Sequence, residues 1–111
     1  MKALNIKKTQ DKLRNKFLKS GVKMIGPETI FFSTDTKIGK GVTIEPYVVF
    51  GKNVIIGNDV IIKSFSQLES CIVENKVELG PYARIRPNTV LKEGSKVGNF
   101  VEIKKSIIGK K

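Results

Sequence analysis

The sequence contains no histidine and a single cysteine, Cys71. One cysteine cannot form an internal disulfide, which fits a reducing cytoplasm, and we expect Cys71 to be a small buried apolar side chain. It has no histidine to activate its thiol, and Ser106 has only lysines beside it. The sequence therefore shows no nucleophile–base pair, and it shows no spacing of ligands typical of a metal site.

Long apolar runs are also missing. None approaches the roughly 20 residues needed to cross a bilayer. The N-terminal stretch MKALNIKKTQDKL has no apolar segment typical of a signal peptide. The 111 residues suffice for one small domain. We therefore expect a cytoplasmic protein with no membrane partner.

Acidic residues are scarce, so the net charge is +11. Residues 1–20 carry seven Lys/Arg and one acid, whereas residues 21–111 carry fourteen and nine. The excess of positive charge thus concentrates in the first segment, which will attract polyanions weakly and in a salt-dependent way. No RNA-recognition motif, zinc-ligand spacing or basic zipper accompanies it, so we do not expect a nucleic-acid partner.

The first segment reads as a helix over residues 5–19. Ile6, Leu13 and Phe17 fall near one face of that helix, and Ser20-Gly21 is a plausible stop. Because this apolar stripe is thin, the helix is marginal alone and should lean on the rest of the protein.

Large apolar residues then recur at intervals of six. The series is Phe32, Ile38, Ile44, Phe50, Ile56, Ile62 and Leu68, followed after one step of five by Val73, Leu79, Ile85, Leu91, Val97 and Ile103. Four positions after these residues comes a smaller or β-branched one. That second series is Thr36, Val42, Val48, Val54, Val60, Ser66, Val77, Ala83, Thr89, Ser95, Val101 and Ile107. Both series are expected to face the interior.

A period of six fits a coil of three short strands and three corners, with 18 residues per turn. Successive turns then lie about 4.8 Å apart. We predict an all-β fold, a left-handed parallel β-helix of about four turns, preceded by one α-helix. The predicted domains are a helical arm at residues 1–21 and the β-helix at residues 22–111, which we expect to be a truncated form of such a domain.

The coil predicts which residues stack. The fourth position of every third hexad holds Tyr47, Phe65, Tyr82 and Phe100. We predict that these aromatic rings form one column on the outside of the coil. Stacked aromatic pairs contribute roughly 0.5–1.5 kcal/mol each.

The stretch GPYARIRP, residues 80–87, places two arginines on the same wall. Arg84 should stack against Glu102 as an exposed ion pair of little energetic weight. Arg86 should instead stack against Lys104, and two cations about 5 Å apart repel by roughly 1–3 kcal/mol. Glu69, one turn earlier, offsets part of this repulsion. A phosphate between Arg86 and Lys104 would offset it better, whereas the alternative is two solvated cations that splay apart.

Three motifs resemble one enzyme family in detail. They are GPYARIRP, then KVGNFVEIKKS at residues 96–106, then a glycine-lysine. The sequence here resembles the acetyltransferase domain of the bifunctional glucosamine-1-phosphate N-acetyltransferase / N-acetylglucosamine-1-phosphate uridyltransferase family. GVKMIGPETI at residues 21–30 resembles the start of that family's β-helix, and residues 1–20 resemble its helical arm.

The resemblance implies that Arg86 and Lys104 contact a sugar phosphate or UDP-sugar. It also implies acetyl-CoA as the cofactor of the intact family, and a trimer with active sites between subunits. In that family the general base is a histidine that lies shortly after the position matching the last residue of this sequence. The family's nucleotide loop lies before the position matching the first residue. We therefore expect no catalytic residue and no bound cofactor within this chain, and no acetyl transfer without a complementary polypeptide. The alternative is a non-catalytic oligomeric scaffold or a degenerate remnant of the gene.

Overall fold

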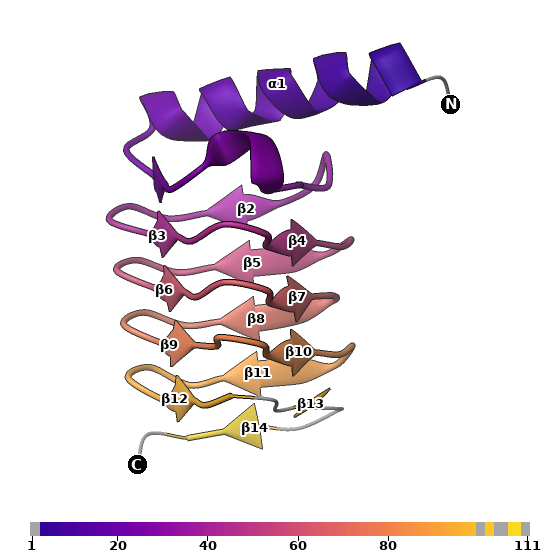
Figure 1. Cartoon of the computed structure of the whole chain (residues 1–111). Helices are drawn as coiled ribbons and strands as arrows, with labels where there is room; N and C mark the ends of the chain where they lie inside the picture. The colour runs from indigo at the N-terminus through magenta and orange to yellow at the C-terminus, as the bar shows by residue number, and fades with distance from the viewer. Residues whose placement is uncertain (1–2, 100–101, 104–106, 110–111) are drawn as a thin grey trace.

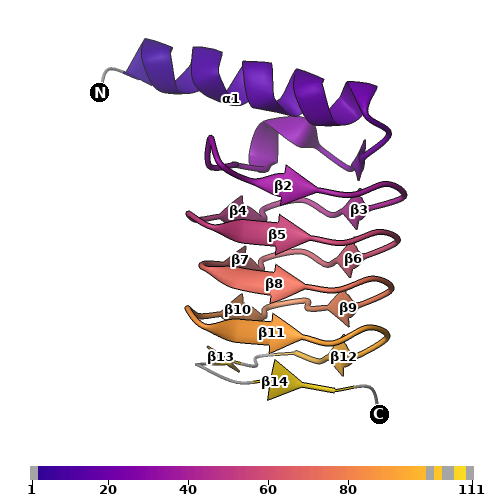
Figure 2. The same cartoon turned by 180° about the vertical axis from the view of Figure 1, so that it is seen from behind.

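The computed structural model describes residues 3–99, 102–103 and 107–109. One helix, α1 (Ala3–Lys19), lies across the N-terminal end of a coil of short strands, and a 3-10 turn, η1 (Pro27–Thr29), lies between helix and coil (Figure 1). The view from behind shows the same stack of turns under the helix (Figure 2). No helix of the described residues is long and apolar enough to cross a membrane.

The strands form three parallel sheets, which we name A, B and C. Sheet A contains β1 (Lys23–Met24), β3 (Thr43–Ile44), β6 (Ile61–Ile62), β9 (Glu78–Leu79) and β12 (Lys96–Val97). Sheet B contains β4 (Val49–Phe50), β7 (Gln67–Leu68), β10 (Arg84–Ile85) and β13 (Glu102–Ile103). Sheet C contains β2 (Lys37–Ile38), β5 (Val54–Ile56), β8 (Cys71–Val73), β11 (Thr89–Leu91) and β14 (Ile107–Ile108). The predicted left-handed β-helix of about four turns is confirmed.

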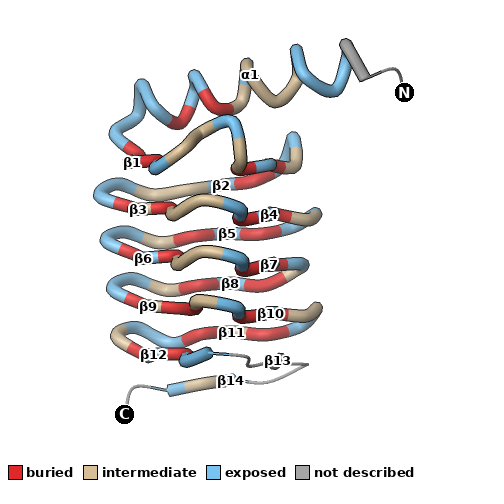
Figure 3. Tube along the Cα trace, viewed as in Figure 1, coloured by how far each residue is buried: buried red, intermediate tan, exposed pale blue. Residues whose placement is uncertain are grey.

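The interior is filled by the two predicted series of inward residues (Figure 3). The large series is buried from Phe32 to Val97 except for Ile38, which is half-buried. The smaller series is buried from Thr36 to Ser95. Two of its hydroxyl groups donate to corner carbonyls: Ser95 Oγ to Lys92 at 2.7 Å and Thr89 Oγ1 to Arg86 at 2.9 Å. Ser66 Oγ accepts from the Ala83 amide of the next turn at 3.3 Å, so these buried hydroxyls have hydrogen-bond partners.

The aromatic column is present where the structure describes it. The rings of Tyr47 and Phe65 lie 5.2 Å apart at 8°, and those of Phe65 and Tyr82 lie 5.0 Å apart at 7°. All three residues have positive φ, between 58° and 62°. They occupy the corner between sheets A and B, where the chain turns sharply. The fourth predicted member, Phe100, lies outside the described residues.

A second corner column consists of asparagines and glycines, between sheets C and A. The Lys40 amide donates to Asn58 Oδ1 at 2.9 Å, and the Asn58 amide donates to Asn75 Oδ1 at 2.8 Å. A Cβ atom on Gly57 would lie 2.5 Å from Asn75 Oδ1 and 2.9 Å from the Asn75 amide nitrogen. Glycine is therefore required here because the next turn approaches so closely.

Helix α1 closes the end of the coil mainly through polar side chains. Gln10 donates to the Phe32 carbonyl and accepts from the Phe32 amide, both at 2.8 Å. Arg14 is buried and donates from Nε to the Ile30 carbonyl at 3.0 Å. Phe17 packs against Phe32 with ring centroids 4.7 Å apart. The helix therefore satisfies backbone groups that the first turn would otherwise expose.

The helix prediction was wrong about Ile6. This side chain was placed on the packing face, but 41% of its surface is exposed. The helix also begins at Ala3, earlier than predicted. Polar residues form the contact between α1 and the first turn, because the end of the coil presents backbone N–H and C=O groups. An isoleucine side chain cannot form hydrogen bonds with these groups.

The prediction for Ile107 was also wrong. This residue was assigned to the interior, but it pairs with the outward Val90 and is 70% exposed, whereas Ile108 pairs with the inward Leu91. The preceding strand keeps the 18-residue register, with Ile103 opposite Ile85. One residue is therefore missing from the step between Ile103 and Ile107, and a shift by one exchanges the two faces of a strand.

Candidate functional site

The candidate site lies at the corner where the chain passes from sheet B to sheet C. Arg86 is the first residue after β10, and the pairing of Ile85 with Leu68 places it beside Glu69 in the preceding turn. The Glu69 amide donates to the Ile85 carbonyl at 2.9 Å, which fixes this register. Arg86 therefore occupies the predicted column position next to Glu69, 17 residues away because of the five-residue step in the repeat.

The Arg86 side chain is half-buried, and its Nε atom is buried. Its carbonyl accepts a hydrogen bond from Thr89 Oγ1 at 2.9 Å, and Pro87 follows it directly. Both features hold the backbone of the corner, since proline fixes one backbone angle and restricts the residue before it. The guanidinium is thus carried by a rigid corner with part of its stem covered.

Lys104, the second predicted ligand-binding residue, lies outside the described residues. Sheet B, which Lys104 follows in the sequence, is nevertheless continuous up to β13, because Arg84 lies opposite Glu102 and Ile85 opposite Ile103. The predicted stacking of Arg84 against Glu102 is confirmed as a register. The pairing of Arg86 with Lys104 stays a prediction.

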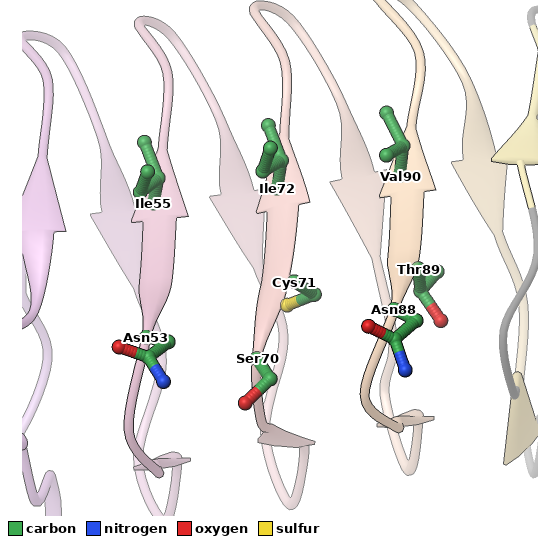
Figure 4. Close-up of a pocket in the computed structure, with 8 residues that line it drawn as sticks. All are labelled: Asn53, Ile55, Ser70, Cys71, Ile72, Asn88, Thr89 and Val90. Carbon is green, nitrogen blue, oxygen red and sulfur yellow. The ribbon is translucent and has the colours of Figure 1, made fainter.

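A groove opens beside this corner, on the sheet C side (Figure 4). Its volume is about 590 Å³. Its lining combines corner side chains, outward strand side chains and the two buried residues Cys71 and Thr89. The corner residues are Asn53, Ser70 and Asn88, and the outward residues are Ile55, Ile72 and Val90. The polar groups lie at the corner, and the aliphatic groups lie along the sheet.

The groove lies where the repeat has its five-residue step from Leu68 to Val73. Between β7 and β8 the corner has two residues, Glu69 and Ser70, whereas the next corner has three, Arg86 to Asn88. The shorter corner lies between two longer ones, so Asn53 and Asn88 flank Ser70 on either side (Figure 4). Sequence reasoning missed this groove, although the five-residue step from Leu68 to Val73 was the signal that could have revealed it.

Cys71 lines this region but is not a reactive group. Only 2% of its surface is exposed, and burial raises the pKa of its thiol from 9.0 to about 12. A thiol in this state does not form the nucleophilic thiolate near neutral pH. The expectation of a small buried side chain is confirmed.

The described part of the chain contains no group of three or more acidic, cysteine or histidine residues that could hold a metal ion. The charged pairs are spread over the surface instead. Lys63 Nζ lies 2.8 Å from Glu78 Oε1, which lowers the pKa of Glu78, and Lys92 Nζ lies 3.6 Å from Glu74 Oε2.

Comparison with known proteins shows the same type of repeat and an extended sequence similarity. The family model "Bacterial transferase hexapeptide (six repeats)" matches residues 35–69. The chain carries a hexapeptide-repeat domain. It is 50% identical over 101 residues to the bifunctional protein GlmU of Zymomonas mobilis subsp. mobilis, and 48% identical over 99 residues to GlmU of Azorhizobium caulinodans. The predicted resemblance to the bifunctional family is confirmed.

These similarities cover most of this chain but only a small part of each relative. They cover 91% and 89% of this chain but 22% of each of the two GlmU proteins. The hexapeptide-repeat domain therefore spans about a fifth of the length of the curated relatives it matches. Among solved structures, a GDP-perosamine N-acetyltransferase variant from Caulobacter crescentus aligns with 91% of this chain and 60% of its own, at 16% identity and a TM-score of 0.44.

Proposed function

We propose that this domain binds a sugar phosphate or UDP-sugar on the wall formed by Arg86 and Lys104, as part of an acetyltransferase that serves UDP-N-acetylglucosamine synthesis for the cell wall. The observation that carries the proposal is the position of Arg86. It is half-buried, held on a rigid corner, and lies one turn away from the expected position of Lys104. The similarity to GlmU over about nine-tenths of the chain supports the substrate class.

The chemistry suits a phosphate ester. The guanidinium of Arg86 presents a planar fork of N–H donors that matches two phosphate oxygens, and a lysine ammonium adds a point charge. Two cations one turn apart, about 4.8 Å, repel each other, and an anion between them replaces repulsion with attraction. Glu69 lies on the other side of Arg86 and limits the local excess of positive charge.

In this proposal the 111 residues supply substrate binding and not the proton transfer. They contain no histidine, so the general base that the family resemblance implies would come from outside these 111 residues. General-base catalysis is typically worth 10²–10⁴ in rate, so we expect negligible acetyl transfer from this chain alone. Acetyl-CoA would be the acetyl donor of the completed enzyme, which we place in the cytoplasm as a trimer.

A second candidate function is that of a non-catalytic oligomeric scaffold. It is favoured by the aliphatic side chains that project outward from sheet C, namely Ile55 and Ile72, which are 44% and 43% exposed. A scaffold would assemble without binding a sugar phosphate. Ligand binding therefore separates the two functions.

Isothermal titration calorimetry with glucosamine-1-phosphate and with UDP-N-acetylglucosamine tests the proposal. We expect saturable binding of at least one ligand, weakened about tenfold or more by Arg86→Ala, because a charge-assisted hydrogen bond is worth roughly 1.5–3 kcal/mol. Arg84→Ala is the matched control, since Arg84 lies on the same strand pair but is exposed. Absence of heat from both ligands at millimolar concentration, or equal affinity of the Arg86→Ala variant, would reject the proposed site.

A further inference from the structure

The corner that carries Arg86 has a close counterpart two turns earlier in the coil. Residues 86–88 join β10 to β11, and residues 51–53 join β4 to β5. Both corners contain three residues, and each ends on an asparagine with positive φ, 67° at Asn88 and 59° at Asn53. A feature that is present in only one of these two corners is therefore not required to turn the chain.

The residue that follows each corner is one such difference. The strand register aligns Val54 with Cys71 and Cys71 with Thr89, so these residues share one inward column. Figure 4 shows Cys71 and Thr89 at the start of successive strands. All three side chains are at most 2% exposed. Because valine and cysteine fill the column without a hydroxyl group, the fold does not need one at the position of Thr89.

The first turn of the column shows that a hydroxyl group here can have a different partner. Thr36 precedes β2 and lies one turn before Val54. Its Oγ1 atom accepts a hydrogen bond from the Ser33 amide at 2.9 Å. In contrast, Thr89 Oγ1 donates to the Arg86 carbonyl at 2.9 Å. The bond from Thr89 is thus directed at the backbone of the residue that carries the guanidinium.

This bond holds a peptide group that has no other means of being held. Pro87 contributes no N–H group, so the carbonyl is the only hydrogen-bonding group of the Arg86–Pro87 peptide. Fixing that carbonyl fixes the plane of the peptide next to the Arg86 Cα atom, and so the direction in which the side chain leaves the backbone. In the counterpart corner the position of Arg86 is occupied by Gly51, which has no side chain to direct.

We propose that Thr89 is a positioning residue of the anion site, whose buried hydroxyl acts through the Arg86 backbone to aim the guanidinium at the phosphate. The inference rests on the proposed function, because it concerns the same site. Thr89 is 1% exposed, so it acts through Arg86 and does not itself contact the ligand. Aim matters because the planar guanidinium forms two parallel hydrogen bonds to a phosphate only when it is correctly oriented.

A purely structural role for the hydroxyl group has a matched comparison within the chain. Ser95 is fully buried, and its Oγ atom donates to the Lys92 carbonyl at 2.7 Å across the same span of three residues. That corner joins β11 to β12 and carries no residue of the proposed site. Removing either hydroxyl group deletes one buried hydrogen bond of the same kind. Both changes should therefore lower stability, whereas only the change at Thr89 should weaken ligand binding.

The test is isothermal titration calorimetry of the 111-residue chain with glucosamine-1-phosphate. We expect Thr89→Val, which copies Val54, to weaken the affinity about threefold to tenfold, the equivalent of one hydrogen bond. Thr89→Ser keeps the hydroxyl group and should bind like the wild type, and so should Ser95→Ala. Chemical denaturation establishes that each variant is folded and compares the losses of stability. If Thr89→Val does not fold, Thr89→Cys takes its place, because it copies Cys71.

A second measurement determines whether Thr89 acts through Arg86. Thr89→Val is introduced into the Arg86→Ala protein, and we expect no further loss of affinity, because the side chain that Thr89 aims is already gone. If the Arg86→Ala protein binds too weakly for this comparison, Thr89→Ser and Ser95→Ala decide the question.

Four results would overturn the inference. They are a Thr89→Val variant that binds like the wild type, a Thr89→Ser variant that binds as weakly as Thr89→Val, a Ser95→Ala variant with the same loss of affinity, and a full further loss in the Arg86→Ala protein. If Arg86→Ala alone weakens binding in that experiment, the proposed site stands and only the role of Thr89 is rejected. A wild type that binds no sugar phosphate rejects both.

Discussion

The rings of Phe65 and Tyr82 lie 5.0 Å apart and 7° from parallel, although the turn that joins them is one residue shorter than the turn from Tyr47 to Phe65. The missing residue belongs to the corner between sheets B and C, on the far side of sheet B from the aromatic corner. The shortening is therefore absorbed at one corner, and the stacking at the other is preserved. Each corner of this coil can change length independently of the others.

The aromatic column should contribute measurably to stability. Phe65 stacks on both neighbours, so Phe65→Asn should lower the free energy of unfolding by about 1–3 kcal/mol, the sum of two stacked pairs. Asparagine is chosen because it tolerates the positive φ of 62° at this position. Chemical denaturation measures the change. Phe65→Tyr keeps both stacks and should leave stability unchanged; a Phe65→Asn variant as stable as the wild type would contradict the role of stacking.

Two corner glycines, Gly57 and Gly98, should differ in whether they tolerate a methyl group. Gly57→Ala would bring Cβ to 2.9 Å from the Asn75 amide nitrogen, a backbone atom of the next turn that cannot rotate away. We expect a loss of roughly 1–3 kcal/mol in unfolding free energy, as for overpacking. Gly98→Ala is the matched control, because no atom lies within 4 Å of its added Cβ. Equal stability of the two variants would show that the close approach is unimportant.

The contribution of helix α1 to stability should depend on Arg14 more than on the exposed lysines of the helix. Arg14→Met keeps the length of the side chain but leaves the buried Ile30 carbonyl without its donor at 3.0 Å. It also removes the bond from Nη2 to the Glu28 carbonyl at 3.3 Å and the contact with Phe31. We expect a loss of about 2–4 kcal/mol in thermal or chemical unfolding, since an unsatisfied buried acceptor costs roughly 1–3 kcal/mol.

The matched control for this prediction is Lys12→Met. Lys12 is exposed on the same helix, and surface substitutions usually change stability by less than about 0.5 kcal/mol. If Arg14→Met and Lys12→Met unfold alike, the helix does not close the coil through this arginine.

The buried thiol gives a dependence of stability on pH. The pKa of Cys71 is raised to about 12 in the fold, so between pH 9 and 12 the unfolded chain loses the thiol proton while the folded chain keeps it. Stability from this group is fully present below pH 9 and falls as the pH rises, by up to about 1.4 kcal/mol per pH unit. Cys71→Val, which copies Val54 in the paired strand, should lack this component. Unfolding of both proteins from pH 7 to 11 measures it; parallel curves would contradict the raised pKa.

Repetition made most of the fold predictable from the sequence. The two inward series need no knowledge of long-range contacts, because a period of six and a two-sided strand determine which residues share a wall. The alignment of Arg84 with Glu102 came from the same counting. Counting failed at Ile107, because this residue pairs with Val90, 17 residues earlier, and not with the residue 18 positions earlier.

The closing contacts were not predictable in the same way. Gln10 and Arg14 bind backbone groups of residues 30 and 32, and nothing in their spacing shows that the end of a coil lies beneath them. The groove beside Arg86 lies at a corner that is shorter than its neighbours. The five-residue step in the sequence reveals the short corner, but it does not show which side chains line the groove. Sequence periodicity predicts which residues share a sheet of the coil. It does not predict how the helix closes the end of the coil or where a groove forms.

A double-mutant cycle on Arg86 and Lys104 tests most directly whether two cations from successive turns hold one anion. Glucosamine-1-phosphate affinity would be measured by calorimetry for the wild type, Arg86→Ala, Lys104→Ala and the double variant. If both residues contact one phosphate, each single substitution weakens binding. The loss of binding free energy in the double variant is then smaller than the sum of the two single losses, by about 1 kcal/mol or more. Strictly additive losses, or an unchanged affinity of either single variant, would contradict a shared site.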